Sequence, residues 1–474
     1  MSRGKELVKN TAIVAVGRVC TKLLSFFLLP FYTAVLSAED YGIVDLFNTY
    51  ISLLLPLIVF QIEDALFRFS IDVRDDEAGK KKVVSTVLLF CTFQSVVFSI
   101  LFVIVQLFVN IPYRWYLLIN VVVSIFSGSM LQLTRGMGDN LGYAFSSFLT
   151  AFSAILLNIV LVLFMDMGAD GLFITAFVSN VIGIIYIIIK EKVYGMFHIA
   201  RFDGKLLKEM LAYSLPLVPN YLSWWVIGAS DKTVVTWFLG VAQSGILSVS
   251  QKFSTAYTTF YSIFNLTWTE NAAIHRDDED SARYYSRIIE TSFRVLACAC
   301  LGIVAGVALV FPLLVNEKFG ASYYQIPIYM LSSLLYSCIG IFSVVYIAFK
   351  KTGEIAKTSL LAAVINLVVN IALIRFIGLY AASVSSAVAY GVLFMFRYFD
   401  IQKMMKITIG SRVTVSVVVM MIIDFAVYYV RIDWLSAVNL ALVLCYALYL
   451  NRTIIREIIE VIKGKIRKRE NNDR

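Results

Sequence analysis

Apolar runs of about 20 residues recur from one end of the chain to the other, separated by short polar breaks. A run of this length matches a helix that crosses the hydrocarbon core of a bilayer. A spanning segment must pair its backbone N–H and C=O groups internally, which leaves helices and closed barrels. The runs do not alternate between apolar and polar residues, as barrel strands would. The sequence therefore predicts an all-α, polytopic membrane protein.

The apolar residues are too many, and too evenly spread, for one soluble core. The 474-residue chain is 59% hydrophobic and 15% charged, whereas soluble domains carry about 25% charged residues. With the polar breaks as boundaries, we expect about fourteen spans, near residues 11–36, 43–66, 83–109, 115–134, 143–165, 171–189, 210–238, 241–268, 288–315, 326–349, 358–377, 379–396, 412–430 and 434–451. The longest polar connections, 190–209 and 269–287, have room only for short amphipathic helices.

Basic residues are distributed unevenly between alternate connections. If the N-terminus is cytoplasmic, 32 of the 41 Lys and Arg residues lie on that side, five lie on the opposite side, among them Lys232 near the outer end of its span, and the other four lie within spans. Cytoplasmic loops of membrane proteins are enriched in Lys and Arg. We therefore expect an even number of spans and both termini in the cytoplasm.

Residue types that support catalysis or metal binding are scarce. The two histidines, His198 and His275, lie in separate connections, and the six cysteines lie in apolar runs without a C-x-x-C pair. This pattern indicates neither a zinc site nor a disulfide framework. The net charge of +9 follows the spans, so we expect no nucleic-acid partner. The N-terminal residues resemble a signal peptide faintly, but Arg18 and Lys22 interrupt the apolar stretch and favour a membrane span.

Two regions of the chain repeat one another. Residues 31–50 align with residues 234–253, with identical Thr, Leu, Gly and Ile residues, among them Gly42 and Gly245. The loops between the paired helices have the same length. Chance similarity between apolar helices is the alternative, and the matching loop lengths and order argue against it. Internal repeats of this kind are common in transporters.

A second match pairs residues 157–164 with 369–376, in the fifth and eleventh spans. Six spans therefore repeat as six more in the same orientation, followed by an extra pair. The sequence predicts an N-terminal six-helix bundle with its connector at 1–209, a second six-helix bundle at 210–411, and two further helices with a basic tail at 412–474.

Charges within spans are candidates for function, because a charge at the bilayer centre costs about 3 kcal/mol or more. Five basic residues form the candidate substrate-binding set of a cationic cavity: Arg18, Lys22, Lys232, Lys252 and Arg294. Four acids are candidates for ion coupling or gating: Glu63, Asp64, Asp231 and Glu270. Snorkelling to the lipid headgroups is the alternative for the shallower cations. Asp231 and Lys232 face about 100° apart on a helix, so we do not expect them to pair with each other.

Three motifs carry a resemblance to a known family. Residues 36–42 read L-S-A-E-D-Y-G, residues 215–219 read L-P-L-V-P, and Asp231-Lys232 precede F-L-G at 238–240 and then Gly245. In this order, the motifs resemble those of the polysaccharide flippases in the multidrug/oligosaccharidyl-lipid/polysaccharide (MOP) exporter superfamily. The resemblance covers nearly the whole chain.

The resemblance implies a MATE-like fold of two six-helix bundles plus two helices in the bacterial cytoplasmic membrane. The implied activity is translocation of an undecaprenyl-pyrophosphate-linked oligosaccharide by alternating access, with the cationic residues holding the pyrophosphate. No cofactor is implied; coupling to Na⁺ or H⁺ is open. The implied partners are the lipid-linked substrate, membrane lipids and the polysaccharide polymerase or chain-length machinery.

Other functions remain open at this point. A MATE-type drug or metabolite exporter is the nearest, although its cationic substrates favour acids at mid-depth. A lipid II flippase handles the same pyrophosphate. A membrane glycosyltransferase or polysaccharide polymerase needs a large outer loop or an intramembrane histidine, and neither is present. We therefore expect a protein that is not an enzyme.

Overall fold

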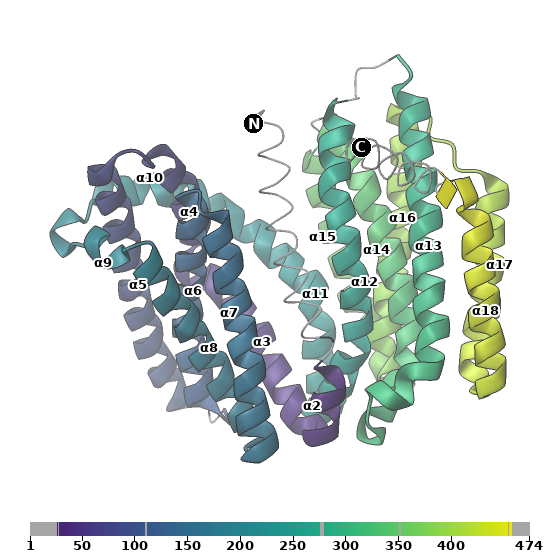
Figure 1. Ribbon diagram of the computed structural model, residues 1–474, viewed down its shortest axis with the longest axis horizontal. Helices are drawn as coiled ribbons and strands as arrows, with labels where there is room; N and C mark the ends of the chain where they lie inside the picture. The colour runs from purple at the N-terminus through teal and green to yellow at the C-terminus, as the bar shows by residue number, and fades with distance from the viewer. Residues whose placement is uncertain are drawn as a thin grey trace, which may run out of the picture. The chain divides into compact units, whose positions relative to one another are not determined.

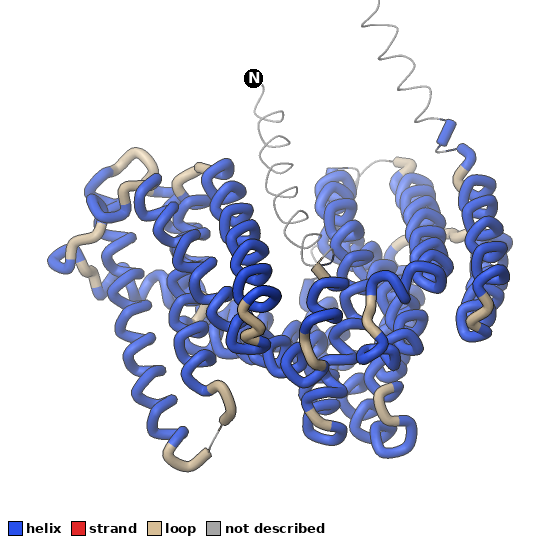
Figure 2. Tube along the Cα trace, turned by 60° about the horizontal axis from the view of Figure 1, so that its bottom comes forward, coloured by secondary structure: helices blue, strands red, loops and turns tan. Residues whose placement is uncertain are grey.

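The computed structural model describes residue 26 and residues 28–109, 111–274, 279–349, 352–453 and 455–456. Every regular element within these ranges is a helix, and they contain no strand (Figure 2). The all-α class predicted from the sequence is confirmed.

The helices follow the predicted spans closely. They are α2 (Leu29–Val35), α3 (Ala38–Val59), α4 (Ile62–Asp72), α5 (Glu77–Gln106), α6 (Arg114–Gly136), α7 (Asn140–Asn158), α8 (Gly168–Lys190), α9 (Val193–Met196), α10 (Gly204–Ser214), α11 (Val218–Leu239), α12 (Val241–Ile274), α13 (Ser281–Leu314), α14 (Ile326–Ala348), α15 (Thr352–Ile377), α16 (Tyr380–Met404), α17 (Ser411–Val430) and α18 (Asp433–Leu450). A π-helical turn at Ile159–Phe164 extends α7, and 3₁₀ helices occupy Ile199–Arg201, Leu215–Leu217 and Glu317–Gln325.

Polar residues at the breaks set where several helices begin. Ser37, Asp76, Asp139 and Asp203 each precede a helix and accept a hydrogen bond from a backbone N–H of its first turn. The first N–H groups of a helix have no partner within it, so such a cap stabilises the helix start. The short polar breaks therefore become tight connections.

Eleven helices in the described ranges are long and apolar enough to cross a membrane. The protein is therefore a multi-pass membrane protein. The predicted span at 11–36 lies largely outside the described residues. The spans predicted at 210–238 and 241–268 correspond to α11 and α12, which are long but rich in Ser, Thr and other polar residues, and they are not among the eleven.

Two predicted spans differ from the helices that form. The span at 43–66 is divided, because Phe60 and Gln61 adopt left-handed backbone conformations with φ of 51° and 57°. Pro56, in the last turn of α3, cannot donate a backbone hydrogen bond to the carbonyl of residue 52, so the end of this helix is weakened. The span predicted to end at 396 instead continues as α16 to Met404. It carries Arg397, assigned to a cytoplasmic connection from the sequence, into the protein interior, where it is 2% exposed.

Residue contacts divide the chain into two compact units. The first holds the described residues up to Val249 together with Leu367–Ala382. The second holds Ser250–Asn366 and the described residues from Ser383 onward. Helices α12 and α15 therefore each contribute to both units. The predicted division at 209 and 411 rests on the repeat and not on contacts, and it stays a prediction.

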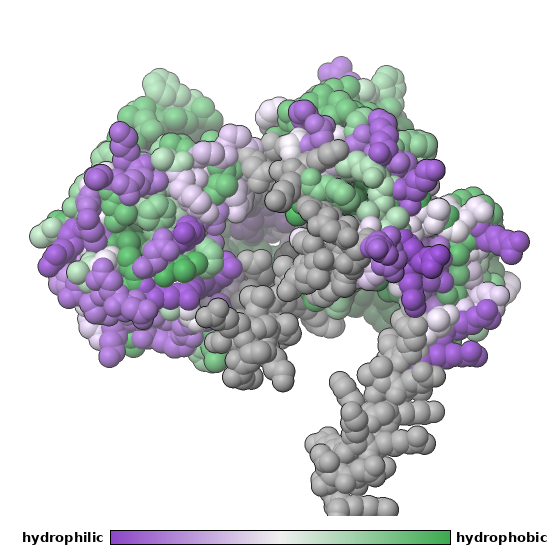
Figure 3. Space-filling model, turned by 90° about the horizontal axis from the view of Figure 1, so that it is seen from above, coloured by the Kyte–Doolittle hydropathy of each residue, from purple (hydrophilic) through white to green (hydrophobic). Residues whose placement is uncertain are grey.

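The first unit packs α3, α4, α5, α6 and α8 around one apolar core, with α7 against α8. Buried side chains such as Val84, Val121 and Phe173 meet there, while the outer face of α5 exposes Phe93 and Ile100. Exposed apolar side chains on a spanning helix are suited to contact with lipid. Hydrophilic side chains gather at the end of this unit where α10 lies (Figure 3).

Ion pairs connect neighbouring segments at the hydrophilic end of this unit. Lys82 pairs with Asp203, the cap of α10, and Lys190 Nζ lies 2.5 Å from Asp139 Oδ2. Burial raises the pKa of Asp139, but hydrogen bonds from Lys190 and the Gly142 N–H outweigh it and lower the pKa. Burial, with the Asp139 carboxylate beside it, raises the pKa of Glu191 to about 6.

In the second unit, α13 is the helix on which the C-terminal pair rests. Both α17 and α18 pack along it (Figure 1). Leu301 and Ala305 of α13 meet Met420 and Val443 in a small apolar cluster. A second cluster joins α12, α13, α14 and α16, with Trp268 and Tyr285 in edge-to-face contact at 5.3 Å.

Candidate functional site

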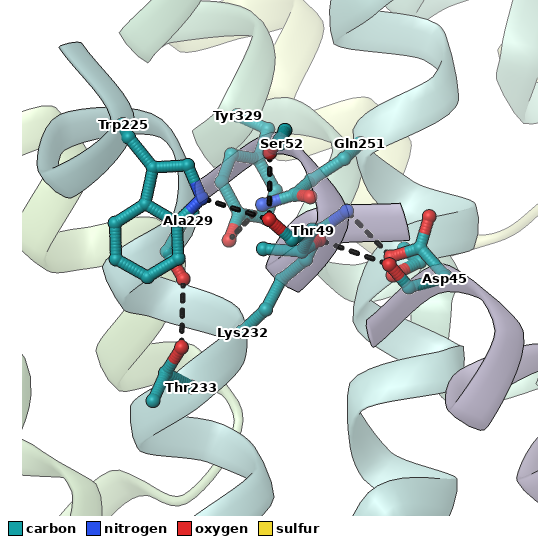
Figure 4. A network of polar contacts seen from close by, with 10 residues as sticks. Asp45, Thr49, Ser52, Trp225, Ala229, Lys232, Thr233, Gln251 and Tyr329 are labelled. Atoms are coloured by element: carbon teal, nitrogen blue, oxygen red, sulfur yellow. Dashed lines mark hydrogen bonds and ion pairs between the residues drawn. The ribbon is translucent and has the colours of Figure 1, made fainter. Parts of the chain in front are cut away.

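A charged network joins α3, α11 and α12 within the first unit (Figure 4). Lys232 Nζ lies 2.5 Å from Asp45 Oδ2, and Ser248 Oγ donates to the same oxygen over 2.6 Å. The Lys232 and Asp45 side chains are 15% and 18% exposed. An ion pair shielded from water to this degree is stronger than a surface pair. It also neutralises Lys232, so this lysine does not stand as an isolated cation.

Backbone contacts place α11 against α3 beside this pair. Trp225 Nε1 donates to the Thr49 carbonyl oxygen over 2.8 Å, one turn along α3 from Asp45 (Figure 4). Ser52 Oγ donates to the same carbonyl over 2.6 Å. The Trp225 indole and the Lys232–Asp45 ion pair thus join α11 to α3 at two points, about two helical turns apart along α11.

Two glycines allow α3 and α12 to cross in close contact. A methyl group added at Gly42 would overlap the Val241 carbonyl oxygen, and one added at Gly245 would overlap the Ala38 carbonyl oxygen. These are equivalent positions in the two aligned segments, so the contact is nearly symmetric. Small residues at helix crossings in membranes permit such backbone approach.

The acids flagged from the sequence have different surroundings. Asp231 is 3% exposed, and its Oδ1 accepts a hydrogen bond of 3.0 Å from Asn370 Nδ2. Lys232 pairs with Asp45 and not with its neighbour Asp231, as the helix geometry predicts. Both side chains of this dipeptide therefore contact other helices of the first unit.

Asp64 belongs to a second polar network in the first unit. Its carboxylate accepts hydrogen bonds from Gln132 Nε2 and from the Tyr221 hydroxyl, each over 3.1 Å. Arg135 Nη1 donates to Gln132 Oε1 over 2.9 Å. Glu63, the residue before Asp64 on α4, is half-buried. This network links α4, α6 and α11.

The predicted cations of the second unit do not gather into one cluster. Lys252 is half-buried on α12 and forms no hydrogen bond or ion pair with the described residues. Arg294, on α13, lies 4.0 Å from Glu290 and donates to Thr291 Oγ1 over 3.4 Å. Arg18 and Lys22 lie outside the described residues, as does the side chain of Glu270. The cationic cavity therefore stays a prediction.

Polar side chains are exposed at mid-length on both repeat-related helices. Between residues 41 and 56 of α3, the exposed positions are Asn48 and Ser52. Between residues 243 and 259 of α12, the exposed position is Thr255, close to Lys252. Lipid-facing positions at this depth are normally apolar, as they are on α5, because polar groups are poorly accommodated in hydrocarbon. These faces are suited to contact with water or a polar ligand.

The structure adds two charged residues to those expected from the sequence. Asp45 lies within a predicted span, where an acid is itself a signal of function, and the repeat alignment places it opposite Ser248. Arg397 directly follows the predicted span 379–396, a position that indicates a surface residue. Its guanidinium donates to Thr358 Oγ1 and Ser359 Oγ over 3.0 Å and to the Ile355 carbonyl over 3.2 Å.

Together, the long apolar helices and the polar contacts among them define a multi-helix membrane protein. The solved structures that share this fold include the following two. A multidrug resistance MATE family transporter of the MOP superfamily, in an inward-facing conformation, matches with a TM-score of 0.65 and 14% identity, over 82% of this chain and 98% of that one. The lipid II flippase MurJ, in an inward closed conformation, matches with a TM-score of 0.65 and 13% identity, over 94% of this chain and 100% of that one.

The sequence comparison identifies the family. The model of the family described as polysaccharide biosynthesis protein matches residues 7–269, which is more than half of the chain. The protein belongs to this family. No curated protein sequence matches the chain. The predicted relation to a polysaccharide biosynthesis family and the predicted MATE-like fold are confirmed.

Proposed function

We propose that the protein is a flippase that moves undecaprenyl-pyrophosphate-linked oligosaccharide repeat units from the inner to the outer leaflet of the bacterial cytoplasmic membrane, for cell-surface polysaccharide synthesis. The family and the transporter fold support translocation of a lipid-linked substrate. The observation that carries the proposal lies on α12 in the second unit, where the exposed Thr255 is one helical turn from the half-buried Lys252. A cation without a carboxylate partner attracts a pyrophosphate.

The substrate is held by this cation and released by alternating access. Lys252 and Arg294, together with Arg18 and Lys22, are the proposed pyrophosphate-binding residues. Lys232 has a different part, because its ion pair with Asp45 holds α11 against α3. Breaking and remaking that pair is our proposed gating step. The exposed Asn48 and Ser52 of the first unit are candidates to bind sugar hydroxyls, and Thr255 is a separate candidate in the second unit.

Both termini are proposed to lie in the cytoplasm, because cytoplasmic connections are the ones enriched in Lys and Arg. Coupling to Na⁺ or H⁺ is assigned to Asp231, a buried carboxylate, while Glu63, Asp64 and Glu270 are gating candidates. A polysaccharide polymerase or chain-length machinery in contact with the protein would receive the product at the outer surface.

Lipid II transport is the second candidate, because the MurJ fold covers nearly the whole chain. Both substrates carry the same polyprenyl pyrophosphate and differ in their sugars. The residues named above bind the shared group, so they do not separate the two.

The test measures translocation in proteoliposomes that contain the full chain and either lipid-linked repeat units or lipid II. We expect Lys252→Ala to lower translocation about tenfold or more, since one charge-assisted contact to a phosphate contributes roughly 1.5–3 kcal/mol. Lys357→Ala is the matched control, because Lys357 is exposed and paired with Glu354. Translocation of lipid II alone would select the second candidate. Unchanged translocation in Lys252→Ala would remove the assigned site.

A further inference from the structure

An apolar groove lies in the second unit between α13, α14, α16 and the start of α17. It encloses about 370 Å³, within the range of ligand sites in proteins. Phe342, Phe394 and Tyr398 form one wall, with the rings of Phe342 and Phe394 stacked at 5.4 Å. Ile289 and Cys338 also line it. The groove is therefore shaped for a hydrocarbon chain.

The lips of the groove face outward. Met395, Phe399 and Val415 line it, and each is more than half exposed. All three lie on helices that qualify as membrane spans. In a bilayer, these residues face lipid, so a chain can enter the groove sideways without crossing a polar barrier.

A rigid connection closes the groove at the end where α16 stops and α17 begins. Gln402 exchanges two hydrogen bonds with the backbone of Ile407, with distances of 2.6 and 3.1 Å. Ser286 Oγ accepts from the Thr408 N–H over 3.1 Å, and Glu290 accepts from the Gly410 N–H over 3.0 Å. The connection is therefore held against α13 and α16.

Two basic residues lie at this end of the groove, Lys406 in the connection and Arg412 in the first turn of α17. Lys406 and Arg412 are exposed, and Arg412 directly follows the lining residue Ser411. The acids nearby are already bonded, Glu290 to the Gly410 N–H and Asp400 to the Tyr346 hydroxyl at 2.8 Å. Neither Lys406 nor Arg412 forms an ion pair with a described acid. An apolar groove thus ends beside two available positive charges.

We propose that this groove binds one acyl chain of an anionic phospholipid of the cytoplasmic leaflet, with its phosphate beside Lys406 and Arg412. Clusters of Lys and Arg at a membrane surface select anionic lipids. No residue assigned to the transported substrate lines the groove; Arg294 is the nearest along the chain, because it follows the lining residue Phe293 on α13. The bound lipid is resident, and it fixes the C-terminal helices to α14 and α16.

The experiment is native mass spectrometry of the purified full chain with equimolar phosphatidylglycerol and phosphatidylcholine. We expect one phosphatidylglycerol retained per protein in preference to phosphatidylcholine. Lys406→Ala combined with Arg412→Ala lowers that preference about tenfold or more. Val415→Trp fills the groove and removes retention of either lipid at this site. Val418→Trp is the control, because Val418 is exposed on the same helix but does not line the groove.

Three results would overturn the proposal. Equal retention of both lipids by the unmodified protein would show that the basic residues do not select a headgroup. Equal retention by Val415→Trp and Val418→Trp would show that the groove holds no chain; Met395→Trp, from the opposite lip, repeats this test if Val415→Trp does not fold. Displacement of phosphatidylglycerol by equimolar undecaprenyl phosphate would assign the groove to the transported lipid.

Discussion

Ser248 donates a hydrogen bond to Asp45, and the two residues occupy equivalent positions in the internal repeat. They are 203 residues apart, which is the offset of the alignment between residues 31–50 and 234–253. Gly42 and Gly245 have the same offset and are also in backbone contact. The first halves of α3 and α12 therefore meet about an approximate two-fold axis. A repeat recognised by sequence is here a physical contact, and Lys232 adds a charge to it.

The first prediction concerns this charge. We expect Asp45→Asn to lower the free energy of unfolding by about 2 kcal/mol, between the values for surface and fully buried ion pairs. The reason is that Lys232 would lose its counter-ion in a site shielded from water. Thermal unfolding in detergent measures the change, and the lipid-flipping assay should fall in parallel. Asp45→Asn combined with Lys232→Met should recover stability, and failure to recover would mean that the ion pair is not the cause.

The second prediction concerns the crossing of α3 and α12. Gly42→Ala and Gly245→Ala should each destabilise the protein by about 1–3 kcal/mol, because the added methyl group overlaps a carbonyl oxygen that cannot move independently of its helix. Gly128→Ala in α6 has open space around it and should be neutral or slightly stabilising. Melting curves of the three variants decide the matter. Similar curves for all of them would contradict a close helix crossing.

The third prediction concerns the buried Arg397. Its planar guanidinium reaches acceptors on α15 and the Ser343 hydroxyl of α14 together. A lysine has one compact ammonium group and cannot reach the same set. We expect Arg397→Lys to lower the free energy of unfolding by about 2–3 kcal/mol. Lys403→Arg on the same helix is exposed and serves as the control; equal stability of the two variants would mean that the network adds little.

The fourth prediction concerns pH. The pKa of Glu191 is about 6 in the folded protein, against an ordinary value of 4.5. Between these values, the folded state binds more protons than the unfolded state, so stability falls as the pH rises from 4.5 to 6. Glu191→Gln should remove this dependence and stabilise the protein at pH 7 by at most about 1 kcal/mol, after allowance for its partial exposure.

The control for the pH experiment has the opposite sign. Lys80 lowers the pKa of Glu77 through a hydrogen bond and its charge, so Glu77→Gln should lose a small stabilisation at neutral pH. Melting temperatures at pH 4 and pH 7 measure both variants. A Glu191→Gln protein that melts like the unmodified chain at both pH values would contradict the assigned pKa.

Much of the fold could be predicted because membrane spans are coded locally. A helix in hydrocarbon satisfies its own backbone groups, so each apolar run specifies a helix without reference to the rest of the chain. The predicted span boundaries differ from the helix ends where individual residues act against the apolar pattern of the sequence. Phe60 and Gln61 break the second span by their left-handed conformation. Arg397 lies beyond the apolar run of its helix and is nevertheless buried, because buried oxygens on neighbouring helices accept its hydrogen bonds.

The candidate site was predicted less completely, because its contacts join residues that are distant along the chain. Lys232 was recognised as a charge within a span, but its partner Asp45 lies 187 residues away. Nothing in the local sequence states that Lys232 has a carboxylate partner while Lys252 has none among the described residues. The apolar groove beside Lys406 could not be predicted from the sequence either, because its walls come from four separate helices.

The sequence alone determined the helical class, the family and the repeat, because these depend on periodic apolarity and on short motifs read along the chain. The tertiary structure decided which charges neutralise each other, where two helices cross at glycine, and which surface residues enclose a groove. These properties depend on distances between separate helices, and packing sets those distances.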